Sequence, residues 1–251
     1  MESTALHPVI RYPVTVRPVT EVSLTGAADL VFWRARLQPE GLAPYDDQGQ
    51  ARLVLIGADM RWMGVPFTEL SISVALSRGP SADQPGGMYL AQAFNSVGWF
   101  AWVERMLFQT PYELGRTELA AQPPACLALT IGGVPVFRAS MPAPRPSAWR
   151  GDEVWEGGVF LPGRVSKTPR AEKLFFARLS GDTEIYPFQP ENDTLELTPT
   201  PRAEAIQWLA DSGFAPREWR LRRAATHQKS QTYARASRAA QAAGGGFAPR
   251  I

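Results

Sequence analysis

The chain is poor in the residue types that build disulfide frameworks, metal centres and nucleophilic triads. Its 251 residues include one cysteine (Cys126), two histidines (His7 and His227) and three lysines. A single cysteine excludes an intramolecular disulfide and a multi-cysteine zinc site, and we expect Cys126 to be a small buried apolar residue. Two histidines argue against a three-histidine metal site and a Ser-His-Asp triad. We therefore expect neither a metal nor a cofactor.

Long apolar runs are also missing. No run of about 18 apolar residues exists, which is the length a membrane-spanning helix needs, and residues 1–20 lack the apolar core of a secretory signal. We therefore expect a cytoplasmic protein that contacts no membrane. The composition, 45% hydrophobic and 20% charged, excludes a disordered or fibrous chain. The 23 prolines and 21 glycines disfavour a helical bundle and favour short elements joined by turns.

The small net charge of +2 conceals an asymmetry along the chain. Residues 220–251 carry seven basic groups and no acid, whereas the other 219 residues carry 19 basic and 24 acidic groups. A basic C-terminal arm can bind nucleic acid or acidic lipid. Among its basic residues the only interleaved aromatic is Tyr233, with Phe247 near the end, so we interpret the arm as a solvated extension and do not expect nucleic acid as a partner.

Most of the chain is predicted to form strands. Seven segments are rich in β-branched or aromatic residues and are bounded by glycine or proline. They are residues 30–37, 51–63, 67–76, 88–94, 126–141, 154–161 and 173–179, with 194–199 as a weaker candidate. This spacing predicts an antiparallel sandwich or barrel rather than βαβ units.

The predicted strand 67–76 alternates between a large apolar face and a face of small or polar residues. The apolar face consists of Leu70, Ile72, Val74 and Leu76. The other face consists of Glu69, Ser71, Ser73 and Ala75. In a sandwich the second face would meet solvent, and in a barrel it could line the lumen and form a ligand pocket. Periodicity alone favours solvent.

Two helices are predicted. Residues 97–108 are apolar on nearly every side, which is typical of a helix buried in a large core. The polar pair on this helix, Glu104 and Arg105, must be paired or face a cavity, because an unpaired buried charge is costly. The second helix follows Thr200 as N-cap and Pro201 as first residue. Its apolar stripe consists of Ile206, Trp208 and Leu209.

Four features follow one another along residues 28–115: a Gly-Leu-x-Pro turn at 41–44, a strand with an aromatic-x-Glu motif at 67–69, a helix carrying Arg105, and Pro111 after that helix. In this order and spacing they resemble the acetoacetate decarboxylase superfamily. The resemblance implies an α+β, mostly β fold: a cone-shaped antiparallel β-barrel with a buried helix and a C-terminal helix. We expect an N-terminal extension over 1–14, the barrel domain over 15–220, and a basic, partly disordered arm over 221–251.

The chain departs from the family pattern at the reactive position. In true decarboxylases the first lysine after the proline forms a Schiff base with a β-keto acid, and a second lysine follows. Here these positions hold Tyr112 and Glu113, and none of the chain's lysines (Lys167, Lys173 and Lys229) is near them in the sequence. A phenol cannot form an iminium, so we do not expect decarboxylation through an imine at Tyr112.

The residues that remain define a candidate site. Glu69 could act as a general base if burial raises its pKa, Tyr112 could donate a hydrogen bond to a carbonyl or enolate, and Arg105 could hold a carboxylate. The expected substrate-binding residues are Glu113, Glu104, Trp62, Phe67, Trp99 and Trp102. Alternatively, Arg105 forms a structural ion pair with Glu69 or Glu104 and Tyr112 is a packed core residue.

These residues support two functional hypotheses. The first is a lyase-type enzyme, lacking the Schiff-base lysine, that acts on a small carbonyl or carboxylate compound in the barrel. The second is a non-catalytic barrel that binds a small molecule, suggested by the many aromatic residues. Relatives often form rings or dimers, so a homo-oligomer is left open.

Overall fold

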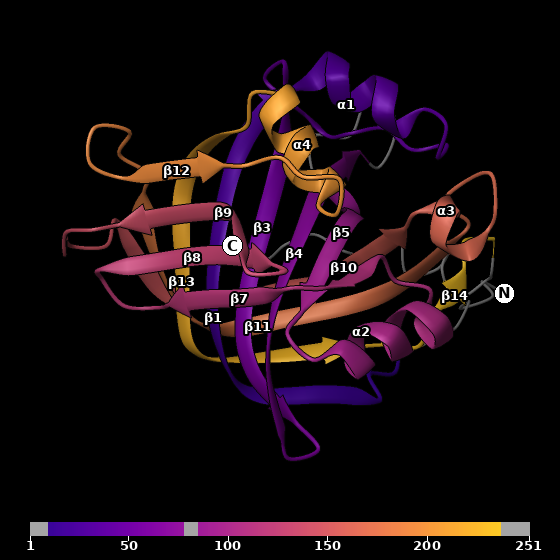
Figure 1. Ribbon diagram of the computed structural model, residues 1–251, viewed down its shortest axis with the longest axis horizontal. Helices are drawn as coiled ribbons and strands as arrows, with labels where there is room; N and C mark the ends of the chain where they lie inside the picture. The colour runs from indigo at the N-terminus through magenta and orange to yellow at the C-terminus, as the bar shows by residue number, and fades with distance from the viewer. Residues whose placement is uncertain (1–9, 78–84, 237–251) are drawn as a thin grey trace, which may run out of the picture.

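The computed structural model describes residues 10–77 and 85–236, and most of these residues lie in two β-sheets (Figure 1). Ten of the described strands form the large sheet. They are β1 (Val14–Asp29), β2 (Asp46–Asp47), β3 (Gln50–Trp62), β4 (Val65–Ser77), β5 (Pro85–Asn95), β6 (Tyr112–Leu114), β10 (Trp149–Leu161), β11 (Lys173–Pro187), β13 (Ala215–Lys229) and β14 (Tyr233–Ala234). The small sheet holds β7 (Arg116–Ala120), β8 (Ala125–Ile131), β9 (Val134–Met141) and β12 (Thr194–Leu197).

The pairing order of the large sheet returns to its starting strand. It runs from β1 through β13, β11, β10, β5, β4 and β3, and β3 pairs again with β1. Most neighbours are antiparallel, but β5 is parallel to both β10 and β6, so the sheet is mixed rather than wholly antiparallel. The mostly β architecture expected from the sequence is confirmed. Within the described residues, no helix has the length and apolar character needed to cross a membrane.

The main core lies between the two sheets, and Figure 1 shows the small sheet crossing in front of the large one. The sheets approach closely where β3 carries Gly57. A Cβ added there would lie 2.1 Å from a terminal methyl carbon of Leu127 on β8, so a larger residue would require Leu127 to move. Trp33 and Trp208, from the two helices at one end of this core, make an edge-to-face contact.

Strand β4 shows the alternation expected for residues 67–76. Leu70, Ile72, Val74 and Leu76 are buried in the main core. The expectation that the other face meets solvent is wrong, because Ser73 and Ala75 are buried and Glu69 is only partly exposed. This second face lies on the side of the large sheet opposite the main core, where side chains from several strands cover it.

The segment 30–37 is helix α1 (Leu30–Leu37) rather than the predicted strand. The Asp29 carboxylate caps it by accepting a hydrogen bond of 2.7 Å from the backbone nitrogen of Phe32. The buried side chains are Leu30, Trp33 and Leu37. These residues are spaced by three and four positions, so they share one helix face. The strand prediction was based on the β-favouring residues of this segment and did not take that spacing into account.

Other details of the structure differ from the sequence-based expectations. Residues 126–141 form two strands, β8 and β9, because Gly132 and Gly133 adopt positive φ angles of 58° and 84° in the turn between them. Cys126 on β8 is half-buried rather than buried.

Strands β1 and β13 were not expected. Because β13 runs to Lys229 and pairs with β1 and β11, the boundary expected at residue 220 falls inside a strand.

The helical segment 97–108 is not buried in the core. It consists of α2 (Gly98–Val103) followed by the π-helix η1 (Glu104–Phe108). Its buried side chains are Phe100 and Ala101. Its large exposed side chains are Trp99, Trp102, Met106 and Leu107. The segment therefore covers the sheet with one narrow face only, and the expectation of a fully buried helix is wrong.

Two other helices complete the description. Helix α3 (Gly163–Ser166) follows β10, and helix α4 (Glu204–Asp211) precedes β13. Helix α4 begins later than predicted: its N-cap is Ala203 rather than Thr200, and no side chain caps it. Its predicted apolar stripe is confirmed, because Ile206, Trp208 and Leu209 are buried.

Candidate functional site

Glu69 and Tyr112, two of the predicted catalytic residues, meet in the structure. Glu69 lies on β4 and Tyr112 begins β6, and both strands pair with β5. The Tyr112 hydroxyl donates a short hydrogen bond to Oε1 of Glu69. Tyr112 is buried, with 7% of its surface exposed. Strand β5 thus brings together two side chains that are 43 positions apart.

The surroundings of this pair shift both proton affinities. Burial raises the pKa of Glu69 to about 6, and the negative charge of Glu104 adds to the effect. The hydrogen bond from Tyr112 and the positive charges of Lys229 and His227 oppose it. Burial raises the pKa of Tyr112 well above its usual value, as do the charges of Glu69 and Glu104. Tyr112 is therefore a neutral donor, and Glu69 titrates in the range that suits a general acid or base.

Glu104 projects from η1 toward the end of β13. Its Oε2 accepts hydrogen bonds from Nζ of Lys229 at 2.6 Å and from Oγ1 of Thr110 at 2.9 Å. The side chains of Lys229 and Glu104 are 18% and 24% exposed. Nζ of Lys229 also lies 4.8 Å from the ring centroids of Phe108 and Phe175, a distance at which a cation and an aromatic ring attract.

Lys229 is the main residue that sequence reasoning missed. Lys229 is far from Tyr112 along the chain, and it lies in the segment that was expected to be a solvated arm. In the folded chain its charge acts on Glu69. The only sequence signal was indirect: Glu104, on a helix taken to be buried, required a cationic partner. That partner is Lys229 and not Arg105.

A second charged network continues along β13. Nη1 of Arg222 donates to Glu21 on β1 at 2.9 Å, and Nη2 donates to Glu153 on β10 at 2.5 Å. The other oxygen of Glu21 lies 2.6 Å from Nε2 of His227. Burial alone would raise the pKa of Glu21, but Arg222 and His227 outweigh burial and lower this pKa to about 2. Within the described residues, no group of three His, Cys, Asp or Glu side chains is arranged to hold a metal ion.

Arg105 and Glu113 bind each other rather than Glu69 or Tyr112. Nη1 of Arg105 lies 3.3 Å from Oε1 of Glu113, and the two side chains are 44% and 49% exposed. Both alternatives considered for Arg105, as a partner of Glu69 or of Glu104, are therefore wrong. The arrangement makes Arg105 a surface ion-pair residue at the edge of the candidate site.

The four predicted aromatic wall residues have different environments. Trp62 and Phe67, on β3 and β4, are partly buried against Phe100 of α2, with ring centroids 5.8 and 4.9 Å from that ring. Trp99 also contacts Phe100, but its surface is 53% exposed, and Trp102 is 55% exposed. Trp62 and Phe67 thus support helix α2, while about half of the surface of Trp99 and of Trp102 is exposed.

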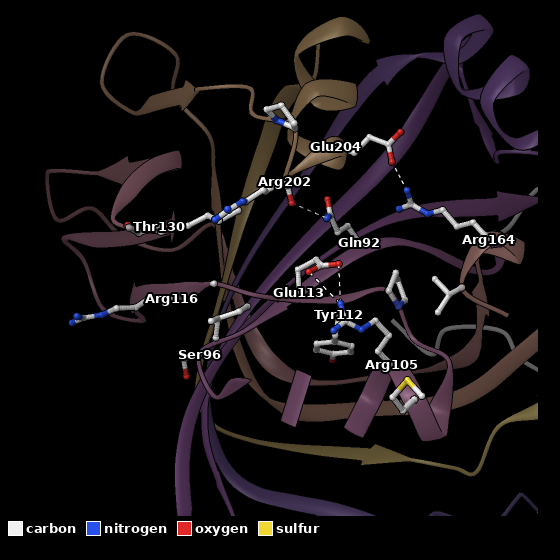
Figure 2. Close-up of a pocket in the computed structure, with 18 of the residues that line it drawn as sticks. Gln92, Ser96, Arg105, Tyr112, Glu113, Arg116, Thr130, Arg164, Arg202 and Glu204 are labelled. Carbon is white, nitrogen blue, oxygen red and sulfur yellow. Dashed lines mark hydrogen bonds and ion pairs between the residues drawn. The ribbon is translucent and has the colours of Figure 1, made fainter. Parts of the chain in front are cut away.

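A cleft of about 1110 Å³ opens beside Tyr112 (Figure 2). It lies among η1, β6, α3, the β8–β9 turn and the segment before α4. Three predicted site residues line it: Arg105, Tyr112 and Glu113. Glu69 is not part of its lining, so Tyr112 stands between the cleft and the carboxylate that its hydroxyl contacts.

Comparison with protein-family models and with curated protein sequences found no match for this chain. Comparison with solved structures found clear matches. The enduracididine biosynthesis enzyme MppR, solved with HEPES buffer bound, aligns with a TM-score of 0.58 at 15% identity over 91% of this chain and 90% of its own. An acetoacetate decarboxylase aligns with a TM-score of 0.58 at 18% identity, covering 93% and 94% of the two chains.

A further match extends the same comparison. The acetoacetate decarboxylase from Legionella pneumophila subsp. pneumophila str. Philadelphia 1 aligns with a TM-score of 0.55 at 16% identity, over 93% of this chain and 98% of its own. Each alignment spans nearly the whole of both chains, so the likeness concerns the entire architecture and not one motif. The chain therefore has the acetoacetate-decarboxylase-like fold that its sequence led us to expect.

Proposed function

We propose that this chain is a lyase-type enzyme that acts on a small carbonyl or carboxylate compound at the Glu69–Tyr112 pair. The observation that carries the proposal is the hydrogen bond from the buried Tyr112 to Glu69, whose pKa lies near 6. A carboxylate with this pKa can both accept and release a proton near neutral pH. Neither group requires a metal or cofactor for this step.

In the proposed reaction, Glu69 takes a proton from the carbon next to the substrate carbonyl or returns one to it. When substrate binds, the Tyr112 hydroxyl turns from Glu69 to the carbonyl oxygen and donates its hydrogen bond there, where negative charge develops as the enolate forms. The cation whose charge reaches Glu69 is Lys229 rather than Arg105, although the Lys229 ammonium is itself paired with Glu104. No covalent imine at position 112 takes part.

The fold neighbours support the substrate class. One of the MppR structures holds pyruvate, and another holds the condensation product of pyruvate and imidazole 4-carboxaldehyde. Both ligands are small and derive from a carbonyl compound that also carries a carboxylate. We extend this chemistry to the present chain on the strength of the Glu69–Tyr112 pair, and we leave the particular substrate open.

The second candidate function is ligand binding without turnover. It is favoured by one observation: Tyr112 and Glu69 satisfy each other, as do Glu104 and Lys229, so the polar groups are paired without a substrate. In this case the site would hold a small carbonyl or carboxylate compound and leave it unchanged.

A metabolite screen with three proteins distinguishes these functions. Small keto acids and aldehydes are incubated with the wild type, Glu69→Gln and Tyr112→Phe, and substrate loss is followed by NMR. The enzyme hypothesis expects turnover by the wild type and a loss of at least about 100-fold in kcat for Glu69→Gln. Equal turnover by all three proteins would refute the mechanism. Ligand affinity that falls in the variants, with no turnover in any protein, would establish the binding function instead.

A further inference from the structure

The cleft in Figure 2 is strongly basic although the chain as a whole is almost neutral. The chain has 26 basic and 24 acidic residues. The cleft is lined by the cationic residues Arg105, Arg116, Arg164, Lys167 and Arg202 and by the carboxylates Glu113 and Glu204. The excess of positive charge is therefore local, and it lies in a concave site where low-dielectric walls focus the field.

Both carboxylates of the cleft are already occupied by guanidinium groups. Glu113 accepts from Arg105 at 3.3 Å. Glu204 accepts from Arg36 at 2.9 Å and also from Arg164, so two guanidinium groups share one carboxylate. The acids thus cannot neutralise the remaining cations of the cleft.

Of the three remaining cations, Arg116 is paired with Glu118 at 3.6 Å, which leaves Arg202 and Lys167. Within residues 10–77 and 85–236, neither side chain makes a hydrogen bond or an ion pair, and both are exposed to the cleft side of the molecule. A guanidinium group binds two anionic oxygens at once, and an ammonium group adds a point charge. The pair is chemically suited to a phosphate group or to neighbouring carboxylates.

The arginines are held in position by buried contacts. The side chain of Gln92 on β5, which is 5% exposed, donates to the carbonyl oxygen of Arg202 at 3.2 Å and accepts from the backbone nitrogen of Ala205 at 3.0 Å. Arg164 donates to the carbonyl oxygen of Ala91 at 3.2 Å. Figure 2 shows Arg164 and Arg202 coming from different sides of the cleft, with Gln92 between them.

The Arg202 guanidinium also lies against the β8–β9 turn. A Cβ built at Gly132 would be 3.5 Å from Nη1 of Arg202, an ordinary contact distance, so the guanidinium lies beside this turn. A site whose groups are already placed loses less conformational entropy on binding than one formed from mobile side chains. The buried contact of Gln92 with the Arg202 backbone and the contact of Arg164 with Ala91 therefore distinguish this cleft from a chance gathering of surface charges.

We propose that this cleft binds a small polyanion, either an organic phosphate or a polycarboxylate, through Arg202, Lys167 and Arg164. Its volume of about 1110 Å³ suits a ligand of cofactor size. The carboxylates Glu113 and Glu204 interrupt the positive surface, which disfavours the continuous track that nucleic acid needs. The cleft adjoins the Glu69–Tyr112 pair, since Tyr112 lines it, but its unpaired cations take no part in the proposed reaction and the inference goes beyond that reaction.

Calorimetric titration with pyrophosphate and with citrate tests the proposal. The wild type is compared with Arg202→Gln, with the double variant Arg202→Gln/Lys167→Gln, and with the control Arg61→Gln. Arg61 is exposed and donates to Gly64 in the β3–β4 turn, away from the cleft. We expect binding by the wild type, a loss of at least tenfold in affinity for the double variant, and a change below twofold for Arg61→Gln.

The outcomes separate the site from general charge attraction. Tighter binding of pyrophosphate identifies the ligand as a phosphate compound, and tighter binding of citrate identifies it as a polycarboxylate. An equal loss in Arg61→Gln and in the double variant would overturn the proposal, as would no binding of either probe at millimolar concentration in low salt. Melting temperatures show whether the variants are folded. Probe binding that persists in Glu69→Gln, at a residue outside the cleft lining, shows that the cleft binds independently of the proposed reaction.

Discussion

Nζ of Lys229 lies 2.6 Å from Oε2 of Glu104, although the two residues are 125 positions apart in the chain. The contact joins the end of β13 to the π-helix η1. It also brings a lysine close enough to lower the pKa of Glu69, in a chain whose two positions directly after Pro111 hold no lysine. The ion pair thus links the covering helix to the proposed acid–base residue.

Replacing Lys229 with Gln is expected to reduce the free energy of unfolding by about 2–3 kcal/mol, because Glu104 would keep its charge in a partly buried place without a cation. The pKa of Glu69 should rise further, since Lys229 lowers it. Urea denaturation measures the first effect and carbon NMR of labelled Glu69 the second. Lys229→Arg should preserve most of both quantities, and Lys173→Gln serves as the lysine control. An unchanged Glu69 pKa in Lys229→Gln would contradict the arrangement.

Borohydride reduction in the presence of a β-keto acid is expected to leave the mass of the protein unchanged. A phenol at position 112 cannot form an imine, and the Lys229 ammonium is engaged by Glu104. Intact-mass spectrometry measures the result, and a Tyr112→Lys variant provides the comparison in which an amine stands after Pro111. A reduced adduct on Lys167, Lys173 or Lys229 of the wild type would show that amine chemistry takes place here.

The raised pKa of Glu69 should appear as a pH dependence of stability. The folded value is about 6 and the ordinary value is 4.5, so the folded protein binds more protons between these pH values. Stability should therefore fall as pH rises through this window, by about 2 kcal/mol at most, and Glu69→Gln should remove this component. Urea denaturation at several pH values tests it, with the exposed Glu118→Gln as control. Identical pH profiles for the wild type and Glu69→Gln would disprove the shift.

Glu21 should show the opposite pH dependence. Its pKa is lowered from 4.5 to about 2, so its contribution is present above pH 4.5 and is lost as pH falls toward 2. Glu21→Gln leaves Arg222 with one carboxylate fewer in a buried place and should cost about 3 kcal/mol. Asp182→Asn, which breaks the exposed pair with Arg150, should cost less than about 1 kcal/mol. Similar losses in the two variants would argue against the buried network.

Local patterns predicted the mostly β character of the chain and part of its core. The alternation of residues 67–76 correctly indicated the core face of β4, and the stripe of α4 correctly indicated Ile206, Trp208 and Leu209. Propensity failed for residues 30–37, where helical spacing of the buried residues outweighed β-favouring neighbours. It failed again for α2 and η1, because an apolar composition does not specify which side chains a neighbouring element will cover.

The sequence by itself determined which residue types are present near position 112 and, through a family resemblance, the fold that carries them. That is why Glu69 and Tyr112 could be assigned, together with Arg105 and Glu113, to one candidate site before any contact was known. Only the tertiary structure decided the partners of the other charges: Lys229 with Glu104, Arg222 with Glu21, and Arg105 with Glu113. The physical reason is that the first two of these contacts join elements that are remote in the chain. They depend on where β13 lies in the folded sheet, next to β1 and β11.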